Sequence, residues 1–143
     1  MSNHHSSFGM RGLLVVALLA AVLVGQYGFG APQAAVAAGC EVVYNIPNQW
    51  NDGFLGDVTV KNNGAAVSSW TVTWTFGGTQ RITNLWNGVV TQSGQAVSVR
   101  NADWNGTIAS GGTVNFGFQG TYSGANAKPT AFKLNGVSCT VAP

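Results

Sequence analysis

Three of the five tryptophans in this 143-residue chain stand directly before short segments that are typical of turns. They are Trp50, Trp86 and Trp104, and the residues that follow them read Asn-Asp-Gly, Asn-Gly and Asn-Gly. Because turns run over the surface of a protein, we expect the three indoles to be exposed at strand ends or in loops. Several exposed aromatic side chains in one small domain form an apolar patch, and such patches mark binding sites.

The chemistry available to this patch is the stacking of flat, uncharged rings. A sugar ring presents C–H groups on both faces and hydroxyls around its rim, so an indole can cover a face while amides bond the rim. The nearest measured analogue, a nucleic-acid base stacked on an aromatic side chain, contributes about 1–3 kcal/mol per contact. Asparagine and glutamine suit the rim because they both donate and accept hydrogen bonds. The tryptophans therefore predict a carbohydrate-binding surface.

The charge of the chain excludes another kind of surface. Charged residues make up only 7% of the sequence, and the formal net charge is +2. Without Arg11, five basic and four acidic residues remain from Cys40 onward, which gives +1. Binding of nucleic acid needs a basic patch. We therefore expect no nucleic-acid partner.

The composition also argues against catalysis and metal binding. A glycoside hydrolase needs two carboxylates beside a cleft. The chain has only four carboxylates, with no paired arrangement: Glu41, Asp52, Asp57 and Asp103. A copper oxygenase needs imidazole ligands, but the only histidines, His4 and His5, lie in a segment that we expect to be removed. We predict a protein that is not an enzyme and that uses no metal or cofactor.

The N-terminal segment is typical of an export signal. Arg11 supplies positive charge, residues 13–24 are apolar, and residues 35–37 (Ala-Val-Ala) have the small-x-small form of a cleavage site. The apolar run is shorter than the roughly 20 residues that cross a bilayer, so we expect no stable membrane insertion. The sequence predicts a cleaved signal peptide at residues 1–38, a mature domain at residues 39–143, and secretion from the cell.

The two cysteines, Cys40 and Cys139, lie near the ends of the mature sequence, and an exported chain with two cysteines most simply pairs them. In the chain-entropy model, a cross-link that closes roughly 100 residues stabilises a fold by about 4.7 kcal/mol. We expect one folding unit between the cysteines, followed by a short tail, and a monomeric protein.

Alternation of apolar and polar residues predicts strands throughout this unit. In residues 70–76 large apolar residues alternate with threonine, so Trp70, Val72, Trp74 and Phe76 share one face. The two tryptophans of this segment are therefore expected in the core. The same alternation adds six residues to the predicted core: Val58, Val60, Phe116, Phe118, Phe132 and Leu134.

Further strands are predicted from composition and turn signals at residues 41–46, 54–62, 80–85, 96–101, 113–119 and 131–137. No segment is convincing as a helix. Short strands separated by turns predict an all-β fold, an antiparallel sandwich of two sheets.

Taken together, these motifs resemble family 2 of the carbohydrate-binding modules, which is common on secreted actinobacterial cellulases and chitinases. The resemblance covers residues 40–139 and rests on eight short motifs: Asn-Gln-Trp at 48–50, Gly-Phe at 53–54, Val-Thr-Val at 58–60, Ser-Trp at 69–70, Asn-Leu-Trp at 84–86, Trp-Asn-Gly at 104–106, Phe-Gly-Phe at 116–118 and Leu-Asn-Gly at 134–136. It implies a sandwich of about nine strands, of immunoglobulin-like or jelly-roll type, closed by one disulfide.

The resemblance also implies which residues bind. Trp50, Trp86 and Trp104 would be the binding tryptophans, and Gly53 would let the first indole lie flat. In the family, glycine at this position accompanies crystalline cellulose or chitin, and arginine accompanies xylan. The resemblance carries a flanking polar role to four further positions: Asn48, Asn84, Gln119 and Asp57. A close relative type carries asparagine in place of Asp57, and a carboxylate cannot donate hydrogen bonds as asparagine does.

The function implied is non-catalytic binding of an insoluble polysaccharide, with crystalline cellulose first. Chitin binding by the same face is one alternative, because both polymers present flat β-1,4-linked chains. A cell-surface adhesin or structural protein that uses the patch against another protein is the other alternative.

Overall fold

Alternating burial defines the strands of the computed structural model, which describes residues 39–143. In β3 (Thr71–Thr75), Val72 and Trp74 are buried, while the threonines between them face outward and are partly exposed. Trp70 and Phe76 flank this strand and are each only 1% exposed. The predicted signal peptide at residues 1–38 lies outside the described residues.

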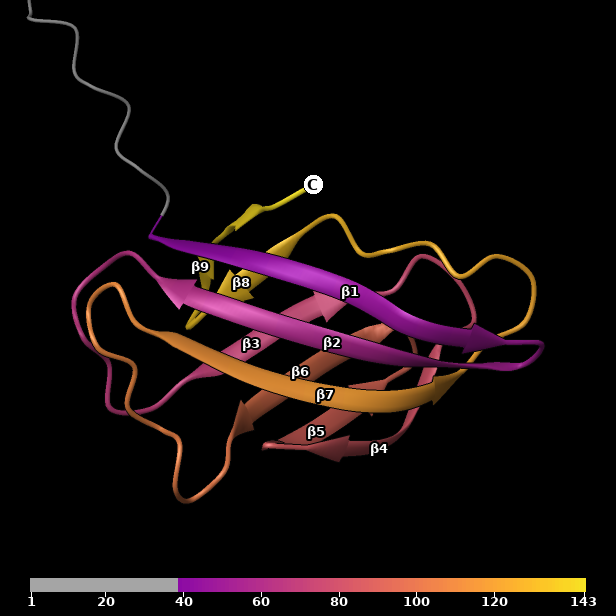
Figure 1. Cartoon of the computed structure of the whole chain (residues 1–143), viewed down its shortest axis with the longest axis horizontal. Helices are drawn as coiled ribbons and strands as arrows, with labels where there is room; N and C mark the ends of the chain where they lie inside the picture. Colours follow the sequence, from indigo (N-terminus) through magenta and orange to yellow (C-terminus); the bar gives the residue numbers. More distant parts are fainter. Residues whose placement is uncertain (1–38) are drawn as a thin grey trace, which may run out of the picture. The chain divides into compact units, whose positions relative to one another are not determined.

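Two sheets of five strands face one another (Figure 1). In spatial order, the first sheet consists of β10 (Thr140–Val141), β1 (Cys40–Trp50), β2 (Gly53–Asn62), β7 (Thr113–Thr121) and β4 (Arg81–Trp86). The second sheet consists of β5 (Gly88–Ser93), β6 (Ala96–Asn101), β3, β8 (Phe132–Leu134) and β9 (Val137–Ser138). All elements assigned within residues 39–143 are strands, so the predicted all-β sandwich is confirmed.

Three edge strands were not predicted. The single strand predicted at residues 131–137 is instead a hairpin of β8 and the edge strand β9, which turns at Asn135 and Gly136, both with positive φ. The other two are β5 and β10.

In β5, partly exposed residues alternate with exposed ones and none is buried. The strand therefore lacks the strong alternation of buried apolar residues that marks the inner strands. β10 falls in the predicted tail after Cys139, and that part of the prediction was wrong. Thr140 and Val141 pair in parallel with Glu41 and Val42 of β1. The sandwich therefore has ten strands, and one of its strand pairs is parallel.

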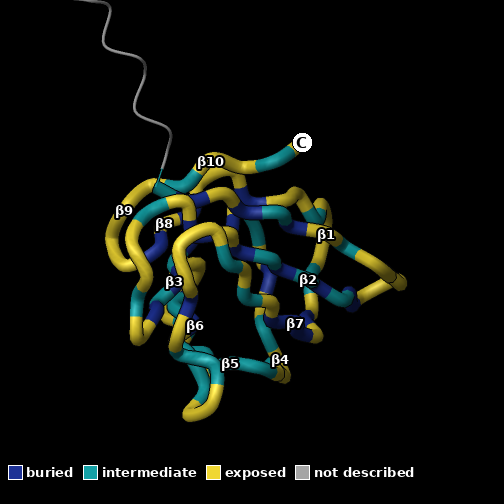
Figure 2. Tube along the Cα trace, turned by 60° about the vertical axis from the view of Figure 1, so that its left-hand side comes forward, coloured by how far each residue is buried: buried dark blue, intermediate teal, exposed yellow. Residues whose placement is uncertain are grey.

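The core lies between the two sheets, where the buried stretches of the trace meet (Figure 2). Trp74 stacks on Phe116 with ring centroids 6.1 Å apart and meets Phe76 edge-on at 5.8 Å. Burial raises the pKa of Tyr44 far above its usual range, so this core phenol stays neutral. The core contains every residue that alternation placed there: Val58, Val60, Trp70, Val72, Trp74, Phe76, Phe116, Phe118, Phe132 and Leu134.

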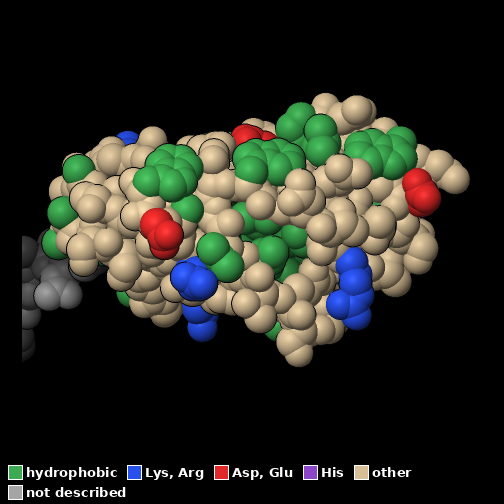
Figure 3. Space-filling view, turned by 90° about the horizontal axis from the view of Figure 1, so that it is seen from below, with side chains coloured by type: hydrophobic (Ala, Val, Ile, Leu, Met, Phe, Trp, Pro, Cys, Tyr) green, Lys and Arg blue, Asp and Glu red, His purple; other side chains and the backbone are tan. Residues whose placement is uncertain are grey.

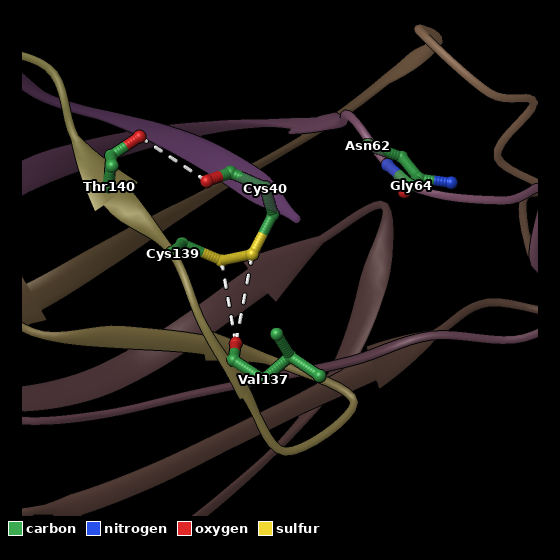
Figure 4. The surroundings of a disulfide bond; sticks show 6 residues. All are labelled: Cys40, Asn62, Gly64, Val137, Cys139 and Thr140. Atoms are coloured by element: carbon green, nitrogen blue, oxygen red, sulfur yellow. Dashed lines mark hydrogen bonds between the residues drawn. A yellow bond between two sulfur atoms is a disulfide. The ribbon is translucent and has the colours of Figure 1, made fainter. Parts of the chain in front are cut away.

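A disulfide joins Cys40 to Cys139, as predicted, and it links residues 99 positions apart (Figure 4). Cys40 begins β1 in the first sheet, and Cys139 follows β9 of the second. Beside the bridge, the Thr140 hydroxyl donates a hydrogen bond of 3.3 Å to the Cys40 carbonyl. The cross-link thus connects the two sheets at the chain ends of the described domain.

Candidate carbohydrate-binding face

The outer face of the first sheet carries most of the residues that the sequence assigned to binding. Side chains alternate between the two faces of a strand, so Phe54 and Val58 of β2 point into the core. Leu55 and Asp57, which lie between these two residues along the strand, point outward and are half-buried. The outer face of β7 likewise presents Gln119.

Trp50, the last residue of β1, rests on the backbone of β2. It pairs with Gly53, the first residue of β2, across a two-residue turn. A Cβ atom at position 53 would lie 2.6 Å from Trp50 Cζ2, which is closer than any real contact of this kind. The indole therefore covers the glycine closely, and Gly53 is buried. The other face of the ring is turned to solvent, and Trp50 is 39% exposed.

Trp86, the last residue of β4, repeats this arrangement on β7. It pairs with Gly117 of β7, and a Cβ atom at position 117 would lie 2.5 Å from the indole Nε1. Trp86 is 43% exposed. Sequence reasoning missed the role of Gly117. The signal was available, because Gly117 stands between the two inward-facing residues Phe116 and Phe118, and a glycine inside a strand marks a close approach.

Trp104 lies in the loop between β6 and β7 and is 72% exposed, the most of the three. Its neighbour Asn105 holds the loop in place from two sides. The Asn105 amide Nδ2 donates a 2.7 Å hydrogen bond to the Asn87 carbonyl, directly after Trp86. The Asn105 carbonyl accepts a 2.8 Å bond from the indole Nε1 of buried Trp70. The loop of Trp104 is thus fastened both to the end of β4 and to the core.

We call Trp50, Trp86 and Trp104 the aromatic strip. Seen from below, exposed hydrophobic side chains are spaced in a row along the upper edge of the molecule (Figure 3). The prediction that these three indoles are exposed at strand ends or in a loop is confirmed. Their role in binding is argued below as a proposal.

Three predicted polar residues form one continuous row across the same face. Asn48 pairs with Leu55, Leu55 pairs with Gln119, and Gln119 pairs with Asn84. The three amides are exposed, and Leu55 is half-buried between them. Along β2, Leu55 lies midway between Gly53 and Asp57. This amide row (Asn48, Gln119 and Asn84) therefore crosses the sheet between the pairing rows that hold the Trp50 and Trp86 indoles.

Asp57 lies in the next pairing row, opposite Gly117, on which the Trp86 ring rests. One carboxylate oxygen accepts a hydrogen bond of 3.0 Å from Asn115 Nδ2. The same amide nitrogen also lies within hydrogen-bonding distance of the Val58 carbonyl and the Thr59 hydroxyl. The structure thus places Asp57 on the predicted face, where Asn115 holds its side chain.

A hydrogen-bonded network that the sequence did not indicate supports Trp50. The Tyr122 hydroxyl donates a 2.9 Å hydrogen bond to the Trp50 carbonyl and accepts one of 2.9 Å from Gln49 Nε2. Asn126 Nδ2 donates to Gln49 Oε1 at 3.1 Å. The Tyr122 ring meets Phe54 edge-on, with centroids 6.0 Å apart. Tyr122 therefore joins the exposed turn of Trp50 to the core.

Other kinds of site find little support in the described residues. Residues 39–143 contain no group of three or more His, Cys, Asp or Glu side chains that could hold a metal ion. No helix long and apolar enough to cross a membrane occurs in that range. A shallow hollow of about 620 Å³ lies on the second sheet, lined in part by Thr73, Ser98 and Lys133. It includes none of the residues of the aromatic strip.

Comparison with known proteins points in the same direction as this geometry. Residues 40–139 match the model of a family described as a cellulose binding domain. Exoglucanase A of Cellulomonas fimi is 50% identical over 110 residues, which are 76% of this chain and 12% of that enzyme. The solution structure of the chitin-binding domain of Chi18aC from Streptomyces coelicolor is 40% identical, with a TM-score of 0.59. The match covers 72% of this chain and 96% of that domain.

A second solved domain, the cellulose-binding family 2 module of ScLPMO10C, is 34% identical, with a TM-score of 0.54. The match covers 75% of this chain and 99% of that module. By contrast, the chain spans only 12%, 29% and 20% of three curated enzymes that it matches. The similarity is therefore to binding modules and not to whole enzymes, and the chain belongs to family 2 of the carbohydrate-binding modules, whose members are non-catalytic binding domains.

Proposed function

We propose that this protein adsorbs to the flat face of a crystalline β-1,4-linked polysaccharide, with cellulose as its first ligand, through the aromatic strip. The observation that carries the proposal is the arrangement of the indoles. Trp50 and Trp86 rest on glycine backbone on one face of one sheet, and the loop of Trp104 is fastened beside Trp86. Rings held against a sheet offer flat surfaces, and the flat ligand is the face of a crystal of extended chains.

The energetics of such a face favour a neutral sugar polymer. Each indole that covers a sugar ring contributes about 1–3 kcal/mol, by analogy with bases stacked on aromatic side chains. The amide row between Trp50 and Trp86 adds donors and acceptors for the hydroxyls at the ring rims. Because the rings are held by backbone contact before the ligand arrives, little side-chain freedom is lost on binding.

Gly53 supports a preference for cellulose or chitin over xylan. The family resemblance associates glycine here with flat crystalline ligands and arginine with xylan. The physical reason is visible, because any side chain at this position would collide with the ring of Trp50 and lift it from the sheet. Cellulose and chitin share the flat β-1,4-linked backbone. Both a chitin-binding domain and a cellulose-binding module resemble this chain.

The proposal also covers the export, the catalytic activity and the oligomeric state of the protein. We infer a signal peptide at residues 1–38, a secreted binding module at residues 39–143, no catalytic activity and a monomeric state. The support is the export-type N-terminal sequence, the disulfide and the similarity to modules of extracellular glycoside hydrolases. Asn48, Asn84, Gln119 and Asp57 are proposed as polar contacts to the polysaccharide.

Depletion isotherms of the mature domain on crystalline cellulose, crystalline chitin and insoluble xylan test the proposal. We expect adsorption on the first two to exceed adsorption on xylan, and Gly53→Arg to weaken binding to cellulose. A Val89→Ala variant is the matched control, because Val89 is 41% exposed but lies on β5 of the other sheet. Xylan preferred by the native domain would contradict the subtype. Loss of adsorption in the presence of excess albumin would favour the protein-binding alternative.

A further inference from the structure

Three of the four acidic residues of the domain lie near the aromatic strip. The sequence contains three aspartates, and each lies beside one tryptophan of the strip. Asp52 follows Trp50 by two residues in the exposed turn between β1 and β2, and exposed Asp103 directly precedes Trp104. In Figure 3 the acidic side chains lie along the same band of the surface as the row of exposed hydrophobic groups.

The third aspartate lies beside the remaining indole. Asp57 pairs with Gly117, and Gly117 pairs with Trp86, whose ring lies over that glycine. Neighbouring strands are about 4.8 Å apart, so the carboxylate lies next to the ring on the outer face. The hydrogen bond from Asn115 keeps it on that face.

The basic side chains are placed differently. On the paired strands of the first sheet only Lys61 and Arg81 are basic. Lys61 pairs with Glu41, so the two charges offset one another at the end of the sheet away from Trp50. Arg81 begins the edge strand β4 and lies in the same pairing row as Trp50 and Gly53, to which it is joined through Thr121. The other three bases lie on the second sheet or in a loop: Arg100, Lys133 and Lys128. In a domain of nearly zero net charge, the aromatic strip therefore has three aspartates near it and one arginine at the β4 end of the Trp50 row.

From this charge distribution we infer that the face discriminates among chitins by charge and prefers a chitin with protonated amines, namely a partly deacetylated one, to fully acetylated chitin. The inference rests on the proposed function, because it assigns a preferred ligand to the same strip. An exposed ammonium beside a carboxylate forms an ion pair that contributes a modest free energy of binding.

The ligand geometry fits this arrangement. A deacetylated sugar unit carries its amine at the ring rim, and each aspartate lies near one tryptophan, Asp52 and Asp103 along the chain and Asp57 across the paired strands. The ring faces of the polymer remain free to stack as in cellulose. A neutral polymer meets no unfavourable charge in this arrangement, whereas a polymer with carboxylate groups would be repelled. Among chitins, the partly deacetylated form should therefore bind more tightly than the acetylated form.

Isotherms of the mature domain on crystalline cellulose, fully acetylated chitin and partly deacetylated chitin test this inference, in a mildly acidic buffer in which the sugar amines are protonated. At about 0.01 M salt we expect the deacetylated form to bind roughly threefold to tenfold more tightly than the acetylated form, the scale of a few exposed ion pairs. At about 1 M salt the Debye length falls to about 3 Å, so the two chitins should bind alike. Adsorption on cellulose should change little with salt.

Variants separate the carboxylates from the rest of the surface. The double variant Asp52→Asn/Asp103→Asn should lose most of the preference for the deacetylated chitin and keep its adsorption on cellulose. Adding Asp57→Asn should bring the ratio of the two chitin affinities to about one. Glu41→Gln removes the one carboxylate that lies away from the strip and should keep the preference.

Two results would overturn the inference while leaving the proposed function intact. One is equal binding to both chitins at low salt together with normal adsorption on cellulose. The other is a triple aspartate variant that retains the native preference. Failure to adsorb on all three polymers would instead overturn the proposed function, and this inference with it.

Discussion

The tryptophans form two groups with opposite surroundings. Trp74 stacks between the sheets on Phe116 and is 4% exposed. Trp86 ends a strand of the first sheet and lies over Gly117 with nearly half of its surface exposed. The two indoles thus differ in what lies beneath them, which is an aromatic ring in one case and bare backbone in the other.

This difference shows how one residue type serves two purposes in a small sandwich. A ring surrounded by other side chains on both faces becomes core and contributes to folding. A ring that rests on a glycine has one face covered by backbone, and its other face is free to contact a ligand. Trp70 connects the two groups, because it is buried against Phe116 and its Nε1 also holds the loop of Trp104.

The largest effect should come from the core member of the comparison. Trp74→Ala should lower the free energy of unfolding by about 3–5 kcal/mol, because it empties a buried aromatic site. Denaturant unfolding measures this change, and binding should be near normal once corrected for the folded fraction. Trp104→Ala is the matched control and should leave unfolding almost unchanged. A folded Trp74→Ala protein that no longer adsorbs would break the division into two groups.

The exposed members should show the reverse behaviour. Trp86→Ala should weaken adsorption on cellulose by about 1–3 kcal/mol, or roughly 5- to 150-fold, through the loss of one stacked ring. Its midpoint of thermal unfolding should barely move. Adsorption isotherms and thermal melts of the same preparation measure both quantities. Early melting with normal binding would instead assign Trp86 to the core.

A smaller effect should follow when the indole is kept and its support is changed. Gly117→Ala places a Cβ atom where the Trp86 ring now lies, so the ring must tilt away from the sheet. We expect weaker adsorption on cellulose, by no more than the loss caused by Trp86→Ala. Gly77→Ala is the control, because an added Cβ there meets no atom within 4 Å. Unchanged binding by the Gly117→Ala protein would show that the flat orientation is not needed.

The smallest effect is expected at the hydrogen bond that supports Trp50. Tyr122→Phe removes the donor to the Trp50 carbonyl and should cost about 0.5–1.5 kcal/mol of folding free energy, with a slight loss of affinity. Tyr44→Phe is the matched control, since the Tyr44 hydroxyl is buried without a hydrogen-bond partner among the described residues. Denaturant unfolding compares the two. Equal stability of both variants would remove Tyr122 from the support of the strip.

Much of this molecule could be predicted from local patterns. The alternation in residues 70–76 identified core residues, because successive side chains of a strand must point to opposite faces. The turn signals after Trp50, Trp86 and Trp104 predicted their exposure, because turns lie at the surface. Two cysteines in a sequence with an export-type N-terminal segment indicated the disulfide.

What the sequence determined by itself was therefore the face on which each side chain lies, along with the exposure of the tryptophans. Only the tertiary structure decided which residues lie opposite one another. It set Gly117 beneath Trp86, aligned Asn48 with Gln119 through Leu55, and paired β10 with β1 in parallel. The physical reason is that strand register depends on contacts between distant segments, whereas alternation along a strand depends only on its own backbone.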